Sequence, residues 1–406
     1  MDRLASSGLS TRSSEQTYKP SVKALVCKNY PQPFECECMA QASMTTSKPI
    51  FSVLRLNLPL DAETFDGLIR SHPNMSLQVL SSQGEDQAVR LAMATMHAYH
   101  VSSAKDDLPD VWRVNEALLQ GSPHLLAVST YGAGYDTVDV PACTRAGVCV
   151  FNQTGSNARA VAEHTLGMML GLAKRLTEAD RRLRRGDHFA RAEGMGFELH
   201  GRTLGLVGIG YIGTLVAQLA RAFGMTVIAH DPFLTAQTIE ERGAQSVPLS
   251  QLLAQSDVVS VHCPRDEQTL GMFNKSAFAA MKPGALFVTT ARGGIHDEAA
   301  LYDALSSGHL RGAGLDVWVI EPPAASHPLL SLDQVIATHH TAGVSKDARV
   351  KMATMAATQL AQMALGAPPS RLINPEVWPE FAKRFEQRMG RPAAPLNPAQ
   401  SLAPDN

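Results

Sequence analysis

Several hallmarks of common protein classes are missing from this chain of 406 residues. No apolar stretch approaches the roughly eighteen residues that cross a bilayer, and the amino terminus lacks the apolar core of a secretory signal. The basic residues cluster only at 181–185, and the formal net charge is -2, so no concentrated basic surface for nucleic acid is expected. These absences favour a cytoplasmic protein that binds neither nucleic acid nor membrane.

Cysteine is also scarce, with six residues in the chain. Three of them cluster without a C-x-x-C spacing or a nearby fourth ligand, which argues against a zinc site, and no metal is expected. These are Cys27, Cys36 and Cys38. Three others lie among apolar residues and are expected to be small, reduced core residues. These are Cys143, Cys149 and Cys263.

What the chain does have is apolar material, which makes up 45% of its residues and suffices for two or three domains. Residues 1–48 lack sustained periodicity and are expected to form a disordered extension. Beyond them short apolar runs alternate with helical patterns, which indicates parallel, doubly wound sheets. Strands are expected at 51–54, 77–80, 97–101, 125–129, 204–207, 226–230, 258–262, 285–290, 314–317 and 335–339. Helices are expected at 62–70, 111–119, 157–185, 212–223 and 346–365.

A glycine motif in the middle of the chain carries the strongest functional signal. Gly208, Gly210 and Gly213 have the spacing Gly-x-Gly-x-x-Gly, between an expected strand and an expected helix. The first glycine permits a tight turn, the second lets the backbone approach a pyrophosphate, and the third lets the helix pack on the strand. Such spacings arise by chance in a chain with 30 glycines, so the strand and helix around this one matter. We predict a dinucleotide site here that also includes Tyr211 and Ile212.

The next expected strand ends at Asp231, which can accept hydrogen bonds from a ribose hydroxyl. A carboxylate here repels the additional phosphate of NADP, and the following Pro232 and Phe233 offer no arginine to receive it. The sequence therefore favours NAD as the cofactor.

The mid-chain position of the motif implies two domains. We expect an NAD-binding domain at 156–340, and a substrate domain built from 49–155 and 341–375. The proline-rich segment 376–406 is expected to be a tail without a domain of its own. Two α/β domains, one for the nucleotide and one for the substrate, suit a hydride-transfer enzyme.

Several motifs make the chain similar to the D-isomer-specific 2-hydroxyacid dehydrogenase family over about residues 50–378. The motifs are Thr290-Ala-Arg-Gly-Gly294, Gly314 to Pro323, Thr338-His-His-Thr-Ala-Gly343, Gly132 to Asp139, and Asn152 to Asn157 with Ala162-Glu-His164. The resemblance implies two doubly wound parallel-sheet domains, with a Rossmann NAD-binding domain inserted in a flavodoxin-like substrate domain.

The resemblance also implies residue roles. It gives catalytic roles to Arg292, Glu321 and His340, and it places the amides of Ala133 and Gly134 on the substrate carboxylate. The remaining matches are expected along the cofactor: His262, Cys263, Pro264, Thr290, Ala291 and Asp316. The family commonly has proline at the position of His339, whose role stays open.

The chemistry of a 2-oxo acid suits these residue types. Arg292 can donate paired hydrogen bonds to the substrate carboxylate and carbonyl. His340 can protonate the developing alkoxide, and take the proton back when the reaction runs toward oxidation. Glu321, if paired with His340, favours the imidazolium and raises the histidine pKa.

The expected activity is therefore NAD-dependent interconversion of a D-2-hydroxy acid and its 2-oxo acid. The acid, its phosphorylation and the physiological direction stay open. One alternative is D-3-phosphoglycerate dehydrogenase specifically, although the run Val101-Ser-Ser-Ala-Lys105 has Ser102 where such enzymes often have arginine. Another is an NAD-sensing protein that resembles the corepressors of this superfamily and recruits partners without turnover. The expected helix at 157–185 and the resemblance favour a homodimer.

Overall fold

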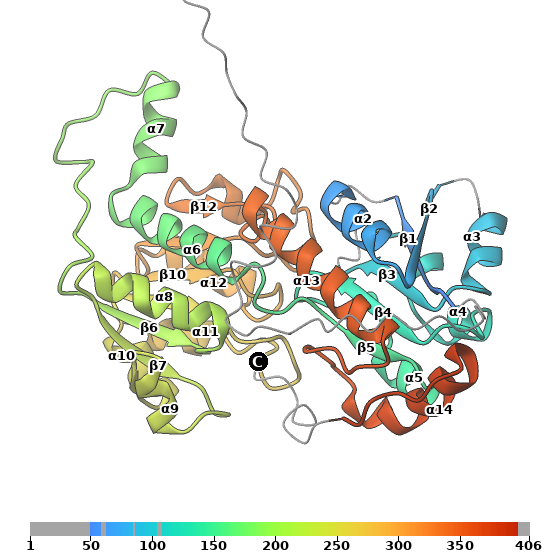
Figure 1. Cartoon of the computed structure of the whole chain (residues 1–406). Helices are drawn as coiled ribbons and strands as arrows, with labels where there is room; N and C mark the ends of the chain where they lie inside the picture. Colours follow the sequence, from blue (N-terminus) through green and yellow to red (C-terminus); the bar gives the residue numbers. More distant parts are fainter. Residues whose placement is uncertain (1–48, 58–61, 84–85, 104–107, 397–406) are drawn as a thin grey trace, which may run out of the picture. The chain divides into compact units, whose positions relative to one another are not determined.

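The computed structural model describes residues 49–396 except 58–61, 84–85 and 104–107. The expected disordered extension, the cluster of Cys27, Cys36 and Cys38, and Lys105 all lie outside the described residues. The described residues belong to one compact unit, and it contains two parallel sheets (Figure 1). Within the described chain, every helix is too short or too polar to cross a membrane.

The first sheet has the order β2-β1-β3-β4-β5, and all its strand pairs are parallel. This is the flavodoxin-like order expected for the substrate domain. Its strands are β1 (Phe51–Leu56), β2 (Met75–Leu80), β3 (Ala98–Ser102), β4 (Ala127–Tyr131) and β5 (Cys149–Phe151). Its helices are α2 (Ala62–Ser71), α3 (Asp86–Met93), α4 (Glu116–Gln120) and α5 (Val140–Arg145). Strands β3, β4 and β5 are buried along their whole length, which explains their unbroken apolar runs.

The second sheet has the order β12-β11-β10-β9-β6-β7-β8, again with parallel pairs throughout. The chain reverses its direction of growth between β6 and β9, as in a Rossmann fold. Its strands are β6 (Thr203–Val207), β7 (Thr226–His230), β8 (Gln245–Ser246), β9 (Val258–Val261), β10 (Leu286–Thr289), β11 (Gly312–Leu315) and β12 (Val335–Ala337). Its helices are α6 (Ala158–Ala173), α8 (Tyr211–Ala222), α9 (Ala236–Glu241), α10 (Leu249–Gln255), α11 (Lys275–Ala280) and α12 (Glu298–Ser306). The expected fold class is confirmed, while the exact domain boundaries stay a prediction.

The expected helix at 157–185 is wrong in one respect, because the chain breaks between α6 and α7 (Leu176–Arg184). Arg175 has a φ of 53°, a left-handed conformation that no helix continues through. The apolar face of α6 packs into the core of the second sheet, where Met169 and Leu172 are buried. That face is therefore used within the chain and cannot by itself support a homodimer.

The segment expected to be a proline-rich tail contains a helix, α14 (Trp378–Met389), which corrects the sequence interpretation. Phe381 and Phe385 are fully buried in the core of the first sheet, together with residues of α13 (Lys346–Ala364). The prolines do not prevent this, because Pro375 begins a short 3-10 turn and Pro379 lies in the first turn of α14. Proline is tolerated at both places, since no intrahelical N–H is needed there.

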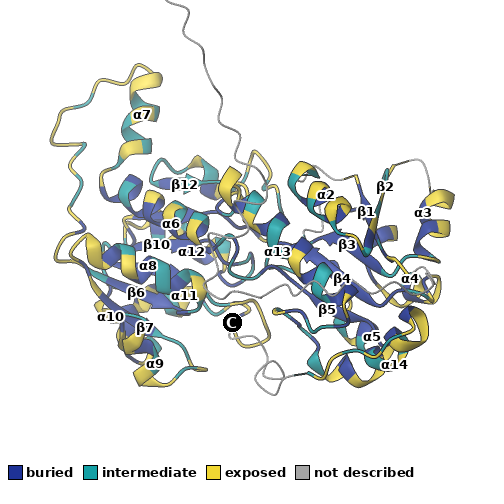
Figure 2. Cartoon of the chain, in the orientation of Figure 1, coloured by how far each residue is buried: buried dark blue, intermediate teal, exposed yellow. Residues whose placement is uncertain are grey.

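The expected helix at 111–119 is also wrong, because the segment divides into a 3-10 turn (Asp110–Trp112) and the later helix α4. Asn115 caps α4 by accepting a hydrogen bond from the Leu118 N–H, which fixes the start of the helix. Two of the expected core cysteines, Cys143 and Cys149, are fully buried and unpaired. Figure 2 shows buried residues along both sheets, whereas α7 has none.

Candidate active site

The glycine motif forms the turn between β6 and α8. Gly208 has a φ of +87°, and a Cβ atom on it would lie 2.8 Å from the backbone nitrogen of Cys263. A Cβ atom on Gly213 would lie 2.5 Å from the carbonyl oxygen of Gly208. A side chain at either place would collide with backbone that cannot give way, so the close turn requires glycine.

The amino terminus of α8 is open to an anionic ligand. Gly210 is its N-cap and provides no side-chain cap, as is also true of the N-caps of α6, α7, α10 and α14. The amides of its first turn, beginning at Tyr211 and Ile212, are therefore available to a phosphate group. The helix has 12 residues, enough for its peptide dipoles to add to this attraction.

Asp231 lies directly after β7, as expected, and is held by two backbone amides. Its Oδ2 accepts from the Ile209 N–H at 3.1 Å and its Oδ1 from the Phe233 N–H at 3.1 Å. Each carboxylate oxygen can accept a further hydrogen bond, as ribose hydroxyls require. Arg242 donates to the Ile209 carbonyl at 2.8 Å. The sequence interpretation missed this arginine beside the motif, because it considered only the residues directly after Asp231.

His262, Cys263 and Pro264 follow β9 and face the glycine turn through the backbone of Cys263. His262 is hydrogen-bonded to the Ser260 hydroxyl through Nε2 at 2.9 Å, and its Nδ1 is buried without a protein partner. Burial lowers the pKa of His262 to about 4 and raises the pKa of Cys263 to about 12. With the uncapped helix and Asp231, these uncharged groups fit a dinucleotide.

His340 and Glu321 form the ion pair expected from the sequence. The Nδ1 of His340 donates to Oε2 of Glu321 at 2.8 Å, and Oε1 of Glu321 accepts from the Trp318 N–H at 3.0 Å. His340 has a φ of 47°, and its own N–H donates to the carbonyl of Asp316 at 2.7 Å. The backbone therefore holds His340 in an unusual left-handed conformation that directs it toward Glu321.

The pair shifts both pKa values toward the charged forms. The hydrogen bond to Glu321 raises the pKa of His340, and it outweighs burial and the charge of Arg292, which lower it. Burial acts to raise the pKa of Glu321, but hydrogen bonding and charge from His340 outweigh it, so this pKa is lowered. His339 and His340 are both exposed, but His339 acts on Glu321 through its charge alone, whereas His340 is hydrogen-bonded to it. The pairing thus distinguishes His340 from its neighbour.

Arg292 lies close to both His340 and the loop that the resemblance assigns to the substrate carboxylate. Its charge acts on the pKa of His340, and its Nη2 lies 3.2 Å from the place of a Cβ atom on Gly134. Ala133 is held in that loop by Asn152, whose Nδ2 donates to its carbonyl at 2.8 Å. Arg292, Glu321 and His340 all follow the carboxyl ends of strands β10, β11 and β12, where open parallel sheets bind ligands.

Asp316 is buried and anchors the turn that carries His340. Its carboxylate accepts from the Thr338 hydroxyl at 2.6 Å and from the N–H groups of Thr341 and Ala342 at 2.8 and 2.9 Å. The Thr338 hydroxyl therefore accepts from His164 Nε2, which lies 3.1 Å away. The expected contact of Asp316 with the nicotinamide stays a prediction. So do the cofactor roles of Thr290 and Ala291, both buried just after β10.

The sequence interpretation missed two charged residues next to Arg292. Asp136 has its Oδ2 3.9 Å from Arg292 Nε and its Oδ1 3.8 Å from Arg265 Nη2. Arg265 also donates to the Gly293 carbonyl at 3.1 Å. A sequence signal was present, because Asp136 lies in the Gly132–Asp139 motif and Arg265 directly follows Pro264. Neither motif indicated that the two residues would meet.

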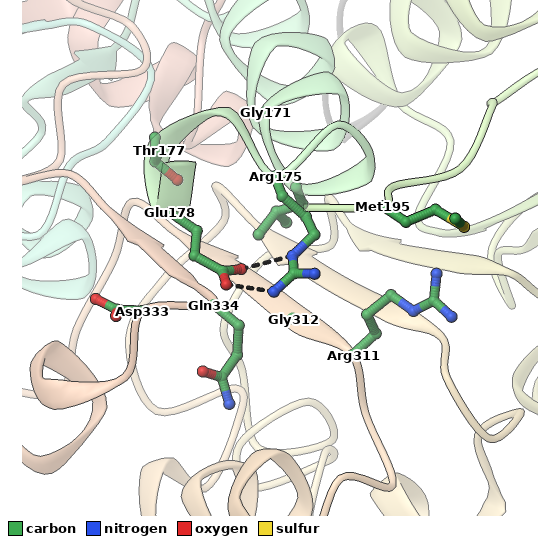
Figure 3. A pocket seen from close by; sticks show the side chains of 10 residues that line it. Gly171, Arg175, Thr177, Glu178, Met195, Arg311, Gly312, Asp333 and Gln334 are labelled. Atoms are coloured by element: carbon green, nitrogen blue, oxygen red, sulfur yellow. Dashed lines mark hydrogen bonds and ion pairs between the residues drawn. The ribbon is translucent and has the colours of Figure 1, made fainter. Parts of the chain in front are cut away.

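A polar pocket elsewhere in the second sheet is unrelated to this site (Figure 3). It lies at the amino ends of β11 and β12, and Arg175 and Glu178 form an ion pair within it. Its lining residues are Gly171, Leu172, Arg175, Thr177, Glu178, Met195, Arg311, Gly312, Asp333 and Gln334. None of them was expected in the site, and ligands of parallel sheets bind at the opposite, carboxyl ends.

Known proteins resemble the chain in both sequence and fold. Residues 166–342 match the family model of the D-isomer specific 2-hydroxyacid dehydrogenase, NAD binding domain. A glyoxylate reductase of Korarchaeum cryptofilum is 38% identical over 267 residues, which cover 65% of this chain and 80% of that protein. The chain therefore belongs to the D-isomer-specific 2-hydroxyacid dehydrogenase family, and residues 166–342 are its match to the NAD-binding domain.

Two further relatives show the range of the family. A D-3-phosphoglycerate dehydrogenase of Archaeoglobus fulgidus is 38% identical over 289 residues, covering 70% of this chain and 55% of that enzyme. The chain thus spans about half the length of the phosphoglycerate dehydrogenases it matches. The crystal structure of a D-lactate dehydrogenase from Aquifex aeolicus, complexed with NAD and lactic acid, is 28% identical, with a TM-score of 0.67 over 77% of this chain and 96% of that one.

Replacement of Gly208 by alanine should weaken NADH binding. The left-handed backbone costs a non-glycine residue about 1–3 kcal/mol, and the new Cβ would also push on the backbone of Cys263. We expect the Kd for NADH, measured by fluorescence titration, to rise at least about tenfold. Gly271→Ala is the matched control, because Gly271 has a φ of +65° and open space around its Cβ position. Equal Kd values for the two variants would contradict the assignment.

Proposed function

We propose that the protein is an NAD-dependent oxidoreductase that interconverts a D-2-hydroxy acid and its 2-oxo acid. The observation that carries this proposal is the 2.8 Å pair of His340 Nδ1 and Glu321 Oε2 beside Arg292. The pair lies at the carboxyl edge of the sheet that also carries the glycine motif and Asp231. A proton donor, a guanidinium and a dinucleotide site at one sheet edge provide what hydride transfer to a carbonyl needs.

Substrate binding falls to Arg292 and the loop at Ala133 and Gly134. The guanidinium donates paired hydrogen bonds to the carboxylate and the carbonyl oxygen, which binds the acid and polarises its carbonyl. The backbone amides of the loop hold the other side of the carboxylate. Asp136 lies 3.9 Å from Arg292, so a substrate carboxylate bound to Arg292 would lie near this negative charge.

Cofactor binding falls to residues of the second sheet. The first turn of α8 with Gly208, Gly210, Tyr211, Ile212 and Gly213 holds the pyrophosphate, and Asp231 holds the adenosine ribose. The segment His262, Cys263, Pro264 lines the adenosine side, while Thr290, Ala291 and Asp316 line the nicotinamide side. When bound, NADH supplies the hydride for the carbonyl carbon of the substrate.

Proton transfer falls to His340. Its Nδ1 is occupied by Glu321, so Nε2 is the nitrogen that donates a proton to the developing alkoxide. The ionised Glu321 stabilises the imidazolium before transfer and fixes the orientation of the ring. In the oxidative direction the neutral His340 accepts the hydroxyl proton of the D-2-hydroxy acid.

We propose a small 2-oxo acid, such as glyoxylate or hydroxypyruvate, as the substrate. The side chain at the position that often carries a phosphate-binding arginine is Ser102, which is buried and uncharged. A phosphorylated 2-oxo acid is the second candidate, favoured by the similarity to D-3-phosphoglycerate dehydrogenases. A cytoplasmic location stays a prediction.

A panel of 2-oxo acids tests the activity. Purified protein should oxidise NADH with at least one of glyoxylate, hydroxypyruvate, phosphohydroxypyruvate, pyruvate or a bulkier acid, and NADPH more slowly. Arg292→Ala should lower kcat/KM roughly 100-fold to 1000-fold, because it removes the group that polarises the carbonyl. Arg145→Ala, at an exposed arginine of the first sheet, is the control. NADH binding without turnover of any acid would instead support the partner-recruiting alternative.

The pH dependence should follow the His340–Glu321 pair. Reduction needs protonated His340, so its kcat/KM should fall as pH rises through the raised pKa of His340, while oxidation should increase. In Glu321→Gln the neutral amide no longer favours the imidazolium, so the pKa of His340 falls. The loss of reduction should then begin at lower pH, as measured from pH–rate profiles. Glu386→Gln, at an exposed acid of α14, should leave the profile unchanged, and an unshifted Glu321→Gln profile would refute the role.

We also propose that the protein is a homodimer, with α7 in the interface. This helix has nine residues and none of them is buried, yet so short a helix is marginal without tertiary packing. Leu176 and Leu183, two turns apart on one face, are 59% and 68% exposed, and nearby Met195 is 70% exposed. A second copy that covers these apolar side chains would supply the missing packing.

Leu183→Asp should convert the dimer to a monomer at micromolar concentration, because a charge in the apolar interface is left without a partner. Sedimentation velocity would measure the mass of both proteins. Leu91→Asp is the matched control, since Leu91 is 65% exposed on α3 of the first sheet. A monomeric parent protein would rule the homodimer out.

A further inference from the structure

We propose that Trp318 is the positioning residue that fixes Arg292, Glu321 and His340 relative to one another. Trp318 lies inside the motif Gly314 to Pro323, but the resemblance assigned it no role. Through its N–H, its carbonyl and its indole ring, it contacts each of the three segments that carry the triad. The inference rests on the proposed function, because it takes these three residues as the reacting groups.

The backbone N–H of Trp318 fixes Glu321. It donates to Oε1 at 3.0 Å, while Oε2 of the same carboxylate accepts from His340. One carboxylate thus bridges Trp318 and the imidazole. A displacement of the Trp318 backbone would rotate the carboxylate and lengthen its bond to His340.

The indole of Trp318 fixes the segment that leads to His340. Its Nε1–H donates to the carbonyl of Thr338 at 2.9 Å, just beyond the end of β12. The side chain of Thr338 is held separately by Asp316. Two hydrogen bonds therefore hold the turn at Thr338: its carbonyl accepts from the Trp318 indole, and its hydroxyl donates to Asp316.

The carbonyl of Trp318 packs against the turn of Arg292. A Cβ atom on Gly293 would lie 1.7 Å from the Trp318 oxygen, so the two backbones are in direct contact. Arg265 also holds this glycine, because its Nη1 donates to the Gly293 carbonyl at 3.1 Å. The position of the residue next to Arg292 is thus set by Trp318.

A half-buried pair, Glu298 and His327, braces Trp318 and the residue after it. The Oε1 of Glu298 accepts from the Val319 N–H at 2.8 Å, and its Oε2 is hydrogen-bonded to His327 Nε2 at 3.2 Å. The ring of His327 meets the indole edge-on, with centroids 5.3 Å apart. Glu298 begins α12 and His327 caps the 3-10 turn Pro328–Ser331, so two separate elements hold the segment 318–319.

A misplacement of a reacting group by about 1 Å can lower the rate of a reaction about 100-fold, so the loss of a positioning contact should lower the rate. Trp318→Phe keeps an aromatic ring but removes the donor to the Thr338 carbonyl. We expect kcat to fall on the order of tenfold to 100-fold with the KM for NADH unchanged. The pKa of His340, followed by NMR of the histidine C–H signals and assigned with His340→Gln, should fall as the bond to Glu321 lengthens.

Trp378→Phe is the matched control. Trp378 is also buried, and its Nε1–H also donates to a backbone carbonyl, that of Ala394 at 3.0 Å, but it lies in the core of the first sheet. Both variants lose one indole hydrogen bond and should lose similar melting temperature. Only Trp318→Phe should change kcat and the pKa of His340. Equal His340 pKa values in the two variants and the parent protein would overturn the proposal.

A second variant keeps the test decisive if Trp318→Phe does not fold. Glu298→Ala removes the brace without changing Trp318, and it should lower the pKa of His340 in the same direction. An unchanged pKa would count against the proposal. The NMR measurement needs no turnover. A parent protein that reduces no 2-oxo acid would contradict the proposed function, and the pKa of His340 would still decide the positioning role.

Discussion

Parallel pairing of the strands of the second sheet is the constraint on which the site depends. Because β6, β9, β10, β11 and β12 all run in the same direction, the segments that follow them emerge at one edge. Gly208, Arg292, Glu321 and His340 are far apart in the chain, and for this reason they all follow strands at the same edge of the sheet. No residue of the site could be moved to the other end of a strand without leaving the site altogether.

At that edge, buried polar groups form hydrogen bonds that fix the positions of the segments that carry the site. Asp316 is 1% exposed, and its carboxylate accepts hydrogen bonds from the turn that carries His340. An unpaired carboxylate at such a depth would be costly, so its hydrogen bonds keep the turn closed. The left-handed backbone at His340 persists because these bonds outweigh its strain. Stability and orientation therefore have the same origin at this site.

Much of the fold and site could be predicted from the sequence, because their signals are local. The glycine spacing, the strand before it and Asp231 lie within one supersecondary unit, and the pairing of His340 with Glu321 followed from the family motifs. The burial of Phe381 and Phe385 depends on a sheet more than 200 positions earlier in the chain, so the prolines around them were misleading. Arg265, Asp136 and Trp318 act through contacts between separate motifs, which no single motif encodes. The break at Arg175 lacks the glycine or proline that usually marks one.

The two ends of the proposed cofactor site contain titratable groups whose pKa values are shifted in different ways. Beside the glycine turn, His262 has a pKa of about 4 and Cys263 a pKa of about 12, each because of burial. Neither side chain changes charge between these values, so both stay uncharged over that range. His340, in contrast, has its pKa raised above the ordinary imidazole value by its hydrogen bond to Glu321. Under the proposed function, a change in the protonation of His340 would therefore leave the charge of His262 and Cys263 beside the glycine turn unchanged.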